Sequence, residues 1–325
     1  MSDHEHYDEA DLAAITASIA PAYGWRGDAG EAVFFARQLD YVKARVYNAK
    51  YPAPAAGLLV PRTSELPAWA ESGVYRTYDQ VGYAKVIANY ADDLPRVDVF
   101  GREAGFTVKT VGDSYGYNKA EIRASQATGA NLDGRRAAAA SRAVDLKLNR
   151  VALVGDADFG LLGILTHPNI GTAVITGGWA TTAGSVIYDD LMIIYNAVVN
   201  QSLQQHRPTG MVMTPTALSR AFSTRMSSDD TRSPGEAFLS VVRGPFGNAG
   251  FNLASAIELV GAGTSGADLV FCGEINSENA SHEVPQDFEP EPPQLRNLET
   301  IINCTARTAG VQVYYPLAFI KVSGT

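Results

Sequence analysis

Apolar side chains recur along the chain at spacings that change from one segment to the next, and each spacing predicts an element. Residues 11–19 carry a weak helical pattern that Pro21 ends. A second run places apolar residues at three- and four-residue steps, at Phe34, Phe35, Leu39, Val42 and Val46. This spacing predicts an amphipathic helix. We therefore expect residues 1–50 to form an N-terminal arm whose apolar face lies on its own body or on a neighbour.

Residues 51–95 have the pattern of an extended arm. Four prolines interrupt 51–67, which predicts extended chain and no packed element, because proline lacks an amide donor and disfavours helix before it. Residues 74–90 space aromatic and β-branched residues by polar ones, as strands do, and 92–95 predicts a turn. A lone two-stranded hairpin is barely stable in water, so we expect this arm to lie on another surface, such as another subunit.

The strongest helical signal covers residues 133–154, after a short strand expected at 106–111 and a short helix at 117–127. Good helix formers dominate it, and 22 residues at 1.5 Å each span about 30 Å. We expect Asp133 to cap its start and Gly155 to end it. The face predicted to be buried carries Ala139, Ala143, Leu146 and Val151, and the charges elsewhere are Arg135, Arg142 and Lys147.

From Thr181 onward, helix and strand patterns alternate, which predicts an α+β fold in which helices cover a mixed sheet. Residues 276–297 are polar, acidic and rich in proline, so they are expected to cross the surface. The expected helices are 185–204, 215–226 and 237–242. The expected strands are 209–214, 256–260, 267–272 and several within 298–323.

Composition adds constraints on the class of protein. The 325 residues are 46% hydrophobic, which is enough for one large or two medium globular domains. A net charge of −9 argues against gripping nucleic acid through the whole surface. Cys272 and Cys304 lack zinc spacing and predict buried, reduced thiols made in a reducing cytoplasm. The first residues of the chain are acidic, whereas a secretory signal begins with basic residues and continues with apolar ones. No apolar run is long enough for a membrane span.

Histidines and glycine-rich loops are candidate chemical sites. No metal spacing links the histidines, which are His4, His6, His167, His206 and His282. Weak metal binding by the first two is the alternative to a disordered acidic terminus, and His167 is expected in a turn. The two glycine-rich loops are Gly155 to Gly160 and Gly261 to Gly266. Gly261 to Gly266 superficially fits a dinucleotide fingerprint, but a strand pattern follows where a phosphate site needs a helix, so a hairpin turn is expected.

Charged pairs are the other candidates. The pair Asp156 and Asp158, or the pair Asp189 and Asp190, has the form of paired carboxylates, but solvated faces or helix caps are expected. Arg135 and Arg136 are expected to form structural salt bridges, with DNA phosphates or a neighbour's acids as the alternative. We therefore predict that the chain is not an enzyme, with no catalytic residue, no cofactor and no metal.

The order of several motifs carries a family resemblance. Tyr115-Gly-Tyr-Asn-Lys-Ala-Glu-Ile-Arg-Ala precedes Gly129-Ala-Asn-Leu-Asp133, and the alanine-rich helix ends in Asn149-Arg-Val-Ala-Leu-Val-Gly155-Asp. Phe159-Gly-Leu-Leu-Gly-Ile-Leu-Thr-His-Pro-Asn-Ile170 follows, and the chain closes on Thr305-Ala-Arg-Thr-Ala-Gly-Val-Gln-Val-Tyr-Tyr-Pro-Leu-Ala-Phe. From about residue 40 onward this set resembles major capsid proteins of tailed bacteriophages, and more narrowly a phage family once filed as a domain of unknown function. Encapsulins, which are related shell proteins, have similar features.

The resemblance implies the HK-ninety-seven-type capsid fold. Its parts are an N-terminal arm at 1–50, an extended β-hairpin loop at 51–95, a peripheral domain with a long spine helix at 96–175 and 290–325, and an axial domain at 176–289. Extended arms suit a closed shell, because they bury area on neighbouring copies without needing a core.

The function implied is self-assembly, through hexameric and pentameric capsomers, into an icosahedral head around phage double-stranded DNA. The DNA is enclosed without sequence-specific binding, no membrane is involved, and scaffold, portal and decoration proteins are the implied partners. The implied location is the virion, with synthesis and assembly in the host cytoplasm. An encapsulin-type nanocompartment subunit is the alternative, and an α/β enzyme of unrecognised type is the third hypothesis.

Overall fold

The computed structural model describes residues 52–85, 96–128 and 132–324. The chain divides into two units, Met1–Pro52 and Ala53–Thr325, and all elements named below belong to the second. The predicted N-terminal arm, with His4 and His6, and the turn expected at 92–95 lie outside the described residues.

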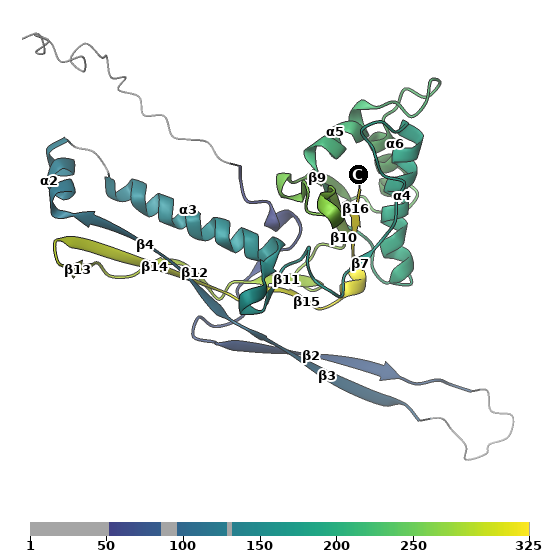
Figure 1. Ribbon diagram of the computed structural model, residues 1–325. Helices are drawn as coiled ribbons and strands as arrows, with labels where there is room; N and C mark the ends of the chain where they lie inside the picture. The colour runs from purple at the N-terminus through teal and green to yellow at the C-terminus, as the bar shows by residue number, and fades with distance from the viewer. Residues whose placement is uncertain (1–51, 86–95, 129–131, 325) are drawn as a thin grey trace, which may run out of the picture. The chain divides into compact units, whose positions relative to one another are not determined.

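The proline-rich stretch packs into the core, so the prediction that it forms no packed element is wrong. It forms the short 3-10 helix η2 (Ala56–Leu58) and strand β1 (Arg62–Thr63) (Figure 1). Leu59 and Val60, which lie between them, are almost completely buried. A backbone N–H of η2 donates to Asn149 Oδ1 over 2.9 Å. Proline removes backbone donors, but it does not prevent the apolar side chains between prolines from being buried.

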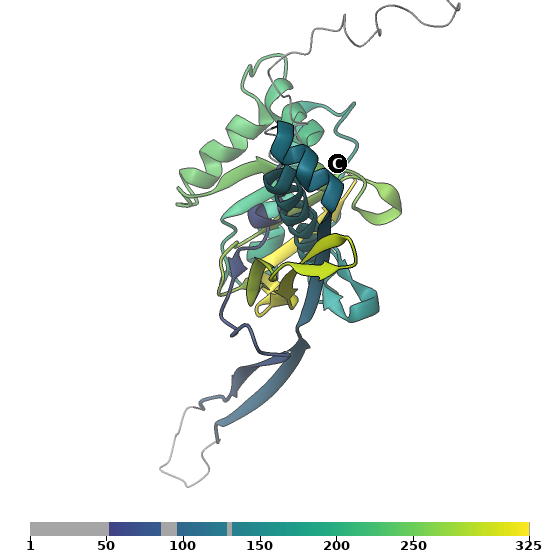
Figure 2. The ribbon, with the colours of Figure 1, turned by 90° about the vertical axis from the view of Figure 1, so that its left-hand side faces the viewer.

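Strands β2 (Ser72–Val81) and β3 (Asp98–Thr107) form an antiparallel ribbon of ten residue pairs. The expected hairpin is therefore present, but its second strand lies beyond residue 95. The strand expected at 106–111 covers the end of one strand and the start of the next, because the chain changes partner there: β3 ends at Thr107 and strand β4 (Lys109–Asn118) begins two residues later. In Figures 1 and 2 no other described element lies beside the outer part of the ribbon.

A second sheet forms the surface on which the long helix lies. Strand β4 pairs along its whole length with β14, whose other edge pairs with β12 and β13. Two helices follow β4 at nearly the predicted positions, and the second packs against β4, β14 and β12 (Figure 2). The bounds are β12 (Gln286–Pro290), β13 (Gln294–Arg296), β14 (Glu299–Thr308), α2 (Lys119–Thr128) and α3 (Leu132–Leu153).

Helix α3 buries Val151 as predicted, but the other three residues expected on the buried face are exposed. Leu146 leaves 44% of its surface exposed, and Ala139 and Ala143 are exposed as well. The buried positions are Ala140, Val144, Leu148, Val151 and Ala152. These residues follow steps of three and four, as one face of a helix must. Part of this stripe packs on Ala306 and Val284 of the sheet side. The prediction chose the wrong stripe because alanines on both sides of α3 make the two faces look alike.

The end of α3 agrees with the prediction. Gly155 has a φ of +82°, a left-handed conformation that favours glycine, and a Cβ atom there would collide with the backbone of residues 161–163. The chain then makes a small antiparallel pair with a 3-10 turn between its strands. These elements are β5 (Gly155–Asp156), η3 (Ala157–Phe159) and β6 (Leu161–Leu162).

A five-stranded sheet and three helices enclose the second core. The strand order is β7-β16-β10-β8-β9, with β8 parallel to β9 and β16 parallel to β7. Helices α4 and α6 bring Leu191 and Phe238 into this core, and the segments before α4 and β9 add Trp179 and Phe251. The bounds are β7 (Gly171–Thr172), α4 (Gly184–Gln201), β8 (Gly210–Met213), α5 (Pro215–Ser223), α6 (Pro234–Arg243), β9 (Asn252–Ser255), β10 (Leu269–Gly273) and β16 (Phe319–Ser323).

Two predictions for the chain after residue 255 differ from the structure. The strand expected at 256–260 is instead the 3-10 helix η4 (Ile257–Leu259), and the strand β9 comes just before it. In the segment expected to cross the surface at 276–297, residues 286–297 are mostly exposed as predicted, but strand β11 (Ala280–Glu283) is buried throughout. It lies between β1 and β15 (Gly310–Val313) in a three-stranded sheet. Its polar side chains are buried with partners in the fold, so composition alone misplaced it.

Candidate assembly surface

The β2–β3 ribbon exposes large apolar side chains along most of its length. Direct pairing puts opposed residues on the same face, so the register assigns each side chain to one of two faces. One face carries Val74, Tyr78, Val97 and Val99, and the other carries Val81 and Phe100; each of these six exposes more than half of its surface. Contiguous apolar surface of this kind marks an interaction site on a folded protein.

Aromatic rings over glycines stiffen the ribbon. Tyr78 lies over Gly101, where a Cβ atom would meet its ring at 3.2 Å, and Phe106 lies over Gly73 in the same way. A ring that covers a cross-strand glycine shields the bare backbone and fixes the register. The salt bridge between Arg76 and Glu103, 2.7 Å long and exposed, adds little.

The root of the ribbon is tied to the body. Tyr75 meets Tyr314 edge-on, with ring centroids 5.0 Å apart. The backbone N–H of Val108, a buried residue at the junction of β3 and β4, donates to Glu71 O over 2.9 Å. The ribbon is therefore anchored at its base while its outer half has no packing partner among the described residues.

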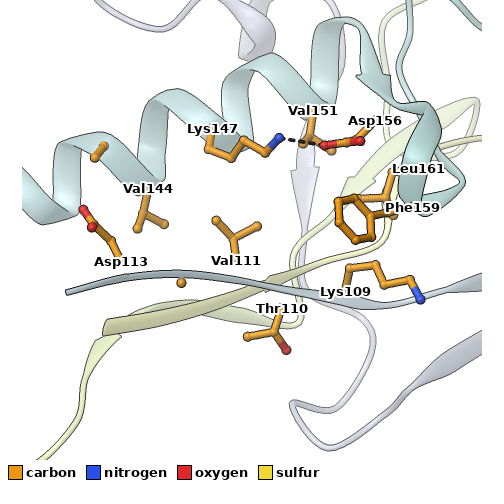
Figure 3. Close-up of a pocket in the computed structure, with 12 residues that line it drawn as sticks. Lys109, Thr110, Val111, Asp113, Val144, Lys147, Val151, Asp156, Phe159 and Leu161 are labelled. Atoms are coloured by element: carbon orange, nitrogen blue, oxygen red, sulfur yellow. Dashed lines mark hydrogen bonds and ion pairs between the residues drawn. The ribbon is translucent and has the colours of Figure 1, made fainter. Parts of the chain in front are cut away.

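A hollow of about 480 Å³ lies between α3 and β4, close to the root (Figure 3). Its lining is mostly apolar, and Val111 of β4 and Val144 of α3 face one another across it. Charged groups stand at its rim: Lys147 forms a 2.7 Å ion pair with Asp156, and Lys109 and Asp113 lie toward opposite ends. Phe159, 59% exposed, also lines it.

In each acidic pair, one carboxylate is engaged in contacts within the fold. Asp156 forms an ion pair with Lys147, and Asp158 lies in the first turn of η3. Asp190 is wholly buried, so the expectation of a solvated face or cap is wrong for it, although Asp189 is exposed. The Asp190 carboxylate accepts hydrogen bonds from the N–H groups of residues 176 and 177, at 2.9 and 3.1 Å, and from Trp179 Nε1 at 2.8 Å. The Asp190 side chain therefore fixes the loop at residues 176–179.

The basic pair at the start of α3 behaves mostly as predicted. Arg136 forms a salt bridge with Glu121 of α2 at 3.0 Å and lies over the Tyr117 ring, 4.9 Å from its centroid. The salt bridge lowers the pKa of the Glu121 carboxyl and raises that of Arg136. Arg135 is exposed.

The glycine loop Gly261 to Gly266 precedes strand β10, as expected. It follows η4 and not a strand, so the prediction of a hairpin turn is wrong. A three-residue 3-10 helix, η5 (Thr264–Gly266), lies within the loop, but no α-helix begins there to bind a phosphate. In the described part of the chain no three histidine, cysteine or acidic side chains gather as metal ligands.

Buried histidines and cysteines are structural. His167 and His282 are buried, and burial is the main cause that lowers the pKa of each, to about 4 for His282. Cys272 and Cys304 are buried free thiols, and burial raises the pKa of both. His206 instead lies 2.7 Å from Glu274 at the partly exposed end of the second core.

The sequence reading missed most of the surface described above. The strand pattern at residues 74–90 predicted the first strand of the ribbon. It did not predict that β2 pairs with β3 or that the Phe100 side chain is exposed. The hollow is lined by Ala143 and Val151, which the prediction placed on the buried face, and by Val144, which it did not. The useful signal was the alternation of apolar residues on two strands with glycines opposite aromatic residues, which marks a ribbon with no buried face.

Comparisons with known proteins agree with this picture. The family model described as "Major capsid protein" matches residues 82–325. No curated protein matches the sequence. Among the described helices none is both long and apolar enough to cross a membrane.

Three solved phage structures share the fold. The capsid of Myoviridae phage XM1 has a TM-score of 0.77 at 14% identity, covering 90% of this chain and 99% of that chain. Gordonia phage Cozz has a TM-score of 0.61 at 14% identity, covering 89% and 92%. Microbacterium phage Oxtober96 has a TM-score of 0.63 at 11% identity, covering 88% and 96%.

The match of the family model identifies a protein that builds a shell from copies of itself. The chain belongs to the major capsid protein family, and it is a structural capsid subunit of phage heads with the HK-ninety-seven-type α+β fold. The predicted family resemblance and fold class are confirmed.

Proposed function

We propose that copies of this chain form hexameric and pentameric capsomers that close into an icosahedral head around phage double-stranded DNA. The observation that supports this proposal is the ribbon, which exposes large apolar side chains at its outer half without any partner in the described chain. Such a surface is covered when a neighbouring copy lies against it, and repeated heterologous contacts of this kind close a shell.

The division into parts is also a proposal, and the strand pairing refines it. The extended loop becomes the β2–β3 ribbon, which ends at Thr107 rather than at residue 95. Helix α3 on the β4–β14 sheet is the candidate spine helix of a peripheral domain. The five-stranded sheet with α4 to α6 is the candidate axial domain, and β16 joins it because β16 pairs with β10. The N-terminal arm stays assigned to residues 1–50.

We propose that the subunit acts by presenting surfaces and that it carries out no catalysis with a cofactor or metal. Scaffold, portal and decoration proteins are the proposed partners during assembly in the host cytoplasm. The net charge of −9 suits a wall that encloses DNA without sequence-specific binding, because an acidic surface does not hold phosphates.

Electron microscopy of the purified full-length protein tests the proposal, alone and with a scaffold protein. Capsomers, shells or tubes are expected, and sedimentation should show particles far heavier than one chain. A protein that stays monomeric at high concentration under every assembly condition contradicts the proposal. A buried ligand or metal in a high-resolution map of the particle would contradict the absence of catalysis.

A further inference from the structure

We propose that the exposed face of α3 is a contact surface for the phosphate backbone of double-stranded DNA, so that this face lines the inside of the head. The proposal rests on the proposed shell function and assigns the surface that meets the enclosed DNA. The observation that carries it is an uneven distribution of charge. Helix α3 has five basic and two acidic side chains, in a chain whose net charge is −9.

Basic side chains form a row along the exposed face of the helix. Arg135, Ala139, Arg142, Leu146 and Arg150 follow steps of three and four residues, so they share one face. This face lies opposite the buried stripe that packs on the sheet. Four of the five residues are exposed, and Arg142 is partly buried. At 1.5 Å per residue the row is about 22 Å long.

The fold neutralises the basic side chains on the flanks of α3 but not those at the two ends of the row. Arg136 and Lys147 each form a salt bridge with an acidic side chain of the body. The side chains of Arg135 and Arg150 make no ion pair with any residue that the structure describes. Asp145 is exposed beside the row and lowers its positive charge without cancelling it. The row is therefore a positive surface that the described chain leaves available to an acidic partner.

The composition of the row favours DNA over a protein partner. A protein interface needs a packed apolar centre with large anchoring side chains, and the row offers only Leu146 between its arginines. Duplex DNA needs no such centre. Its phosphates recur every 3.4 Å along each strand, so the row runs past about six of them. Arginine contacts to phosphates carry no sequence information, which agrees with enclosure of DNA without sequence-specific binding.

Binding of a DNA duplex of about 30 base pairs, which is longer than the row at 3.4 Å per pair, tests the surface. Fluorescence anisotropy is measured with unassembled full-length protein over a range of salt concentrations. The double variant Arg135→Gln with Arg150→Gln should bind several-fold more weakly at low salt. Its slope of log K against log salt should be smaller by about two, because each lost phosphate contact removes about 0.9. Both arginines are exposed, so the variant should keep its melting temperature.

The double variant Arg207→Gln with Arg225→Gln is the matched control. These exposed arginines lie in the loops after α4 and α5, and their side chains make no ion pair within the described residues. The control loses the same charge and should bind the duplex as wild type does. Equal losses in the two double variants, or no binding by wild type, overturn the DNA contact. An acidic peptide of equal charge that binds more tightly than the duplex, through the same two arginines of α3, overturns the choice of partner.

Photocrosslinking in DNA-filled particles gives an independent readout. Leu146→Cys lies in the row, whereas Thr110→Cys is exposed and points away from α3 on the other side of the sheet (Figure 3). A photoreactive label reaches each new cysteine, since the native cysteines are buried. Irradiation should join DNA to the Leu146→Cys copy with a yield several-fold above that of Thr110→Cys. Equal yields, or adducts of Leu146→Cys with protein alone, overturn this inference and leave the shell function intact. Failure of wild-type protein to assemble overturns the shell function, while the anisotropy measurement still decides the DNA contact.

Discussion

At the scale of single residues, buried polar groups determine the local geometry of the second core. Asp190 is the clearest case, because one carboxylate without surface exposure satisfies three N–H donors of the loop at 176–179. A buried carboxylate persists only when its lone pairs are used. Asp190, which the sequence presented as one member of an acidic pair, therefore holds α4 and the loop before it together by hydrogen bonds.

Asp190→Ala should lower the free energy of unfolding by about 3 kcal/mol, because it leaves the buried N–H donors of Gly177 and Trp179, and the partly buried one of Thr176, without an acceptor. Urea denaturation of the unassembled subunit measures the change. Asp189→Ala is the control: the neighbouring side chain is exposed, and its loss should change stability by less than about 0.5 kcal/mol. Equal effects of the two substitutions would contradict the assigned role.

His282 should make stability fall in acid. Burial, with a smaller contribution from Arg62, lowers its pKa from 6.5 to about 4, so the folded chain holds it neutral. Its contribution is complete above pH 6.5 and is lost as the pH falls from 6.5 to about 4, because the unfolded chain takes up the proton first. The difference amounts to about 3 kcal/mol. His167 acts in the same direction, since burial lowers its pKa too.

Urea unfolding of wild type and His282→Gln at pH 7 and at pH 4.5 measures this contribution. The variant should be less stable at pH 7, because the ring contact with Thr308 Oγ1 at 3.1 Å is altered, but it should lose less stability on acidification. An equal loss in both proteins would show that His282 is not held neutral by the fold.

At the scale of elements, the lengths and types of helices were easier to predict than their faces. The 22-residue helix α3 begins and ends within one residue of its predicted bounds, because good helix formers and a left-handed glycine act locally. Which face of α3 is buried depends on the sheet beneath it, and the strands of that sheet come from both ends of the chain. The burial of β11 depends in the same way on β1 and β15, which composition cannot reveal.

The true face of α3 gives a matched pair of substitutions. Leu148 is 4% exposed in the core under α3, and Leu146, two residues earlier, is 44% exposed. Leu148→Asp buries an unpaired charge and should cost several kcal/mol, seen as insoluble protein or a much lower melting temperature. Leu146→Asp should stay folded and soluble. Unfolding by Leu146→Asp with a stable Leu148→Asp would restore the face first predicted from the sequence.

At the scale of the whole molecule, the described chain separates folding from assembly. Buried side chains of the body come from segments far apart in sequence, including Leu59 and Val60. The ribbon contributes almost nothing to these cores beyond its root. A deletion that starts at Ala53 would therefore unfold the body, contrary to what the extended-arm prediction implies. A cut within the ribbon leaves the cores untouched.

Shortening the ribbon should abolish assembly while the body stays folded. Residues 77–102 are replaced by the two-residue turn Asn-Gly, which joins the paired residues Arg76 and Glu103 in a geometry that hairpins favour. The contact between Tyr75 and Tyr314 is kept, so the root stays anchored. The melting temperature should change by only a few degrees, because the removed side chains that the structure describes are exposed. Sedimentation and electron microscopy should then show free subunits or incomplete capsomers where wild type gives particles. Normal shells from the shortened chain would mean that the exposed apolar ribbon is not the surface that joins the copies.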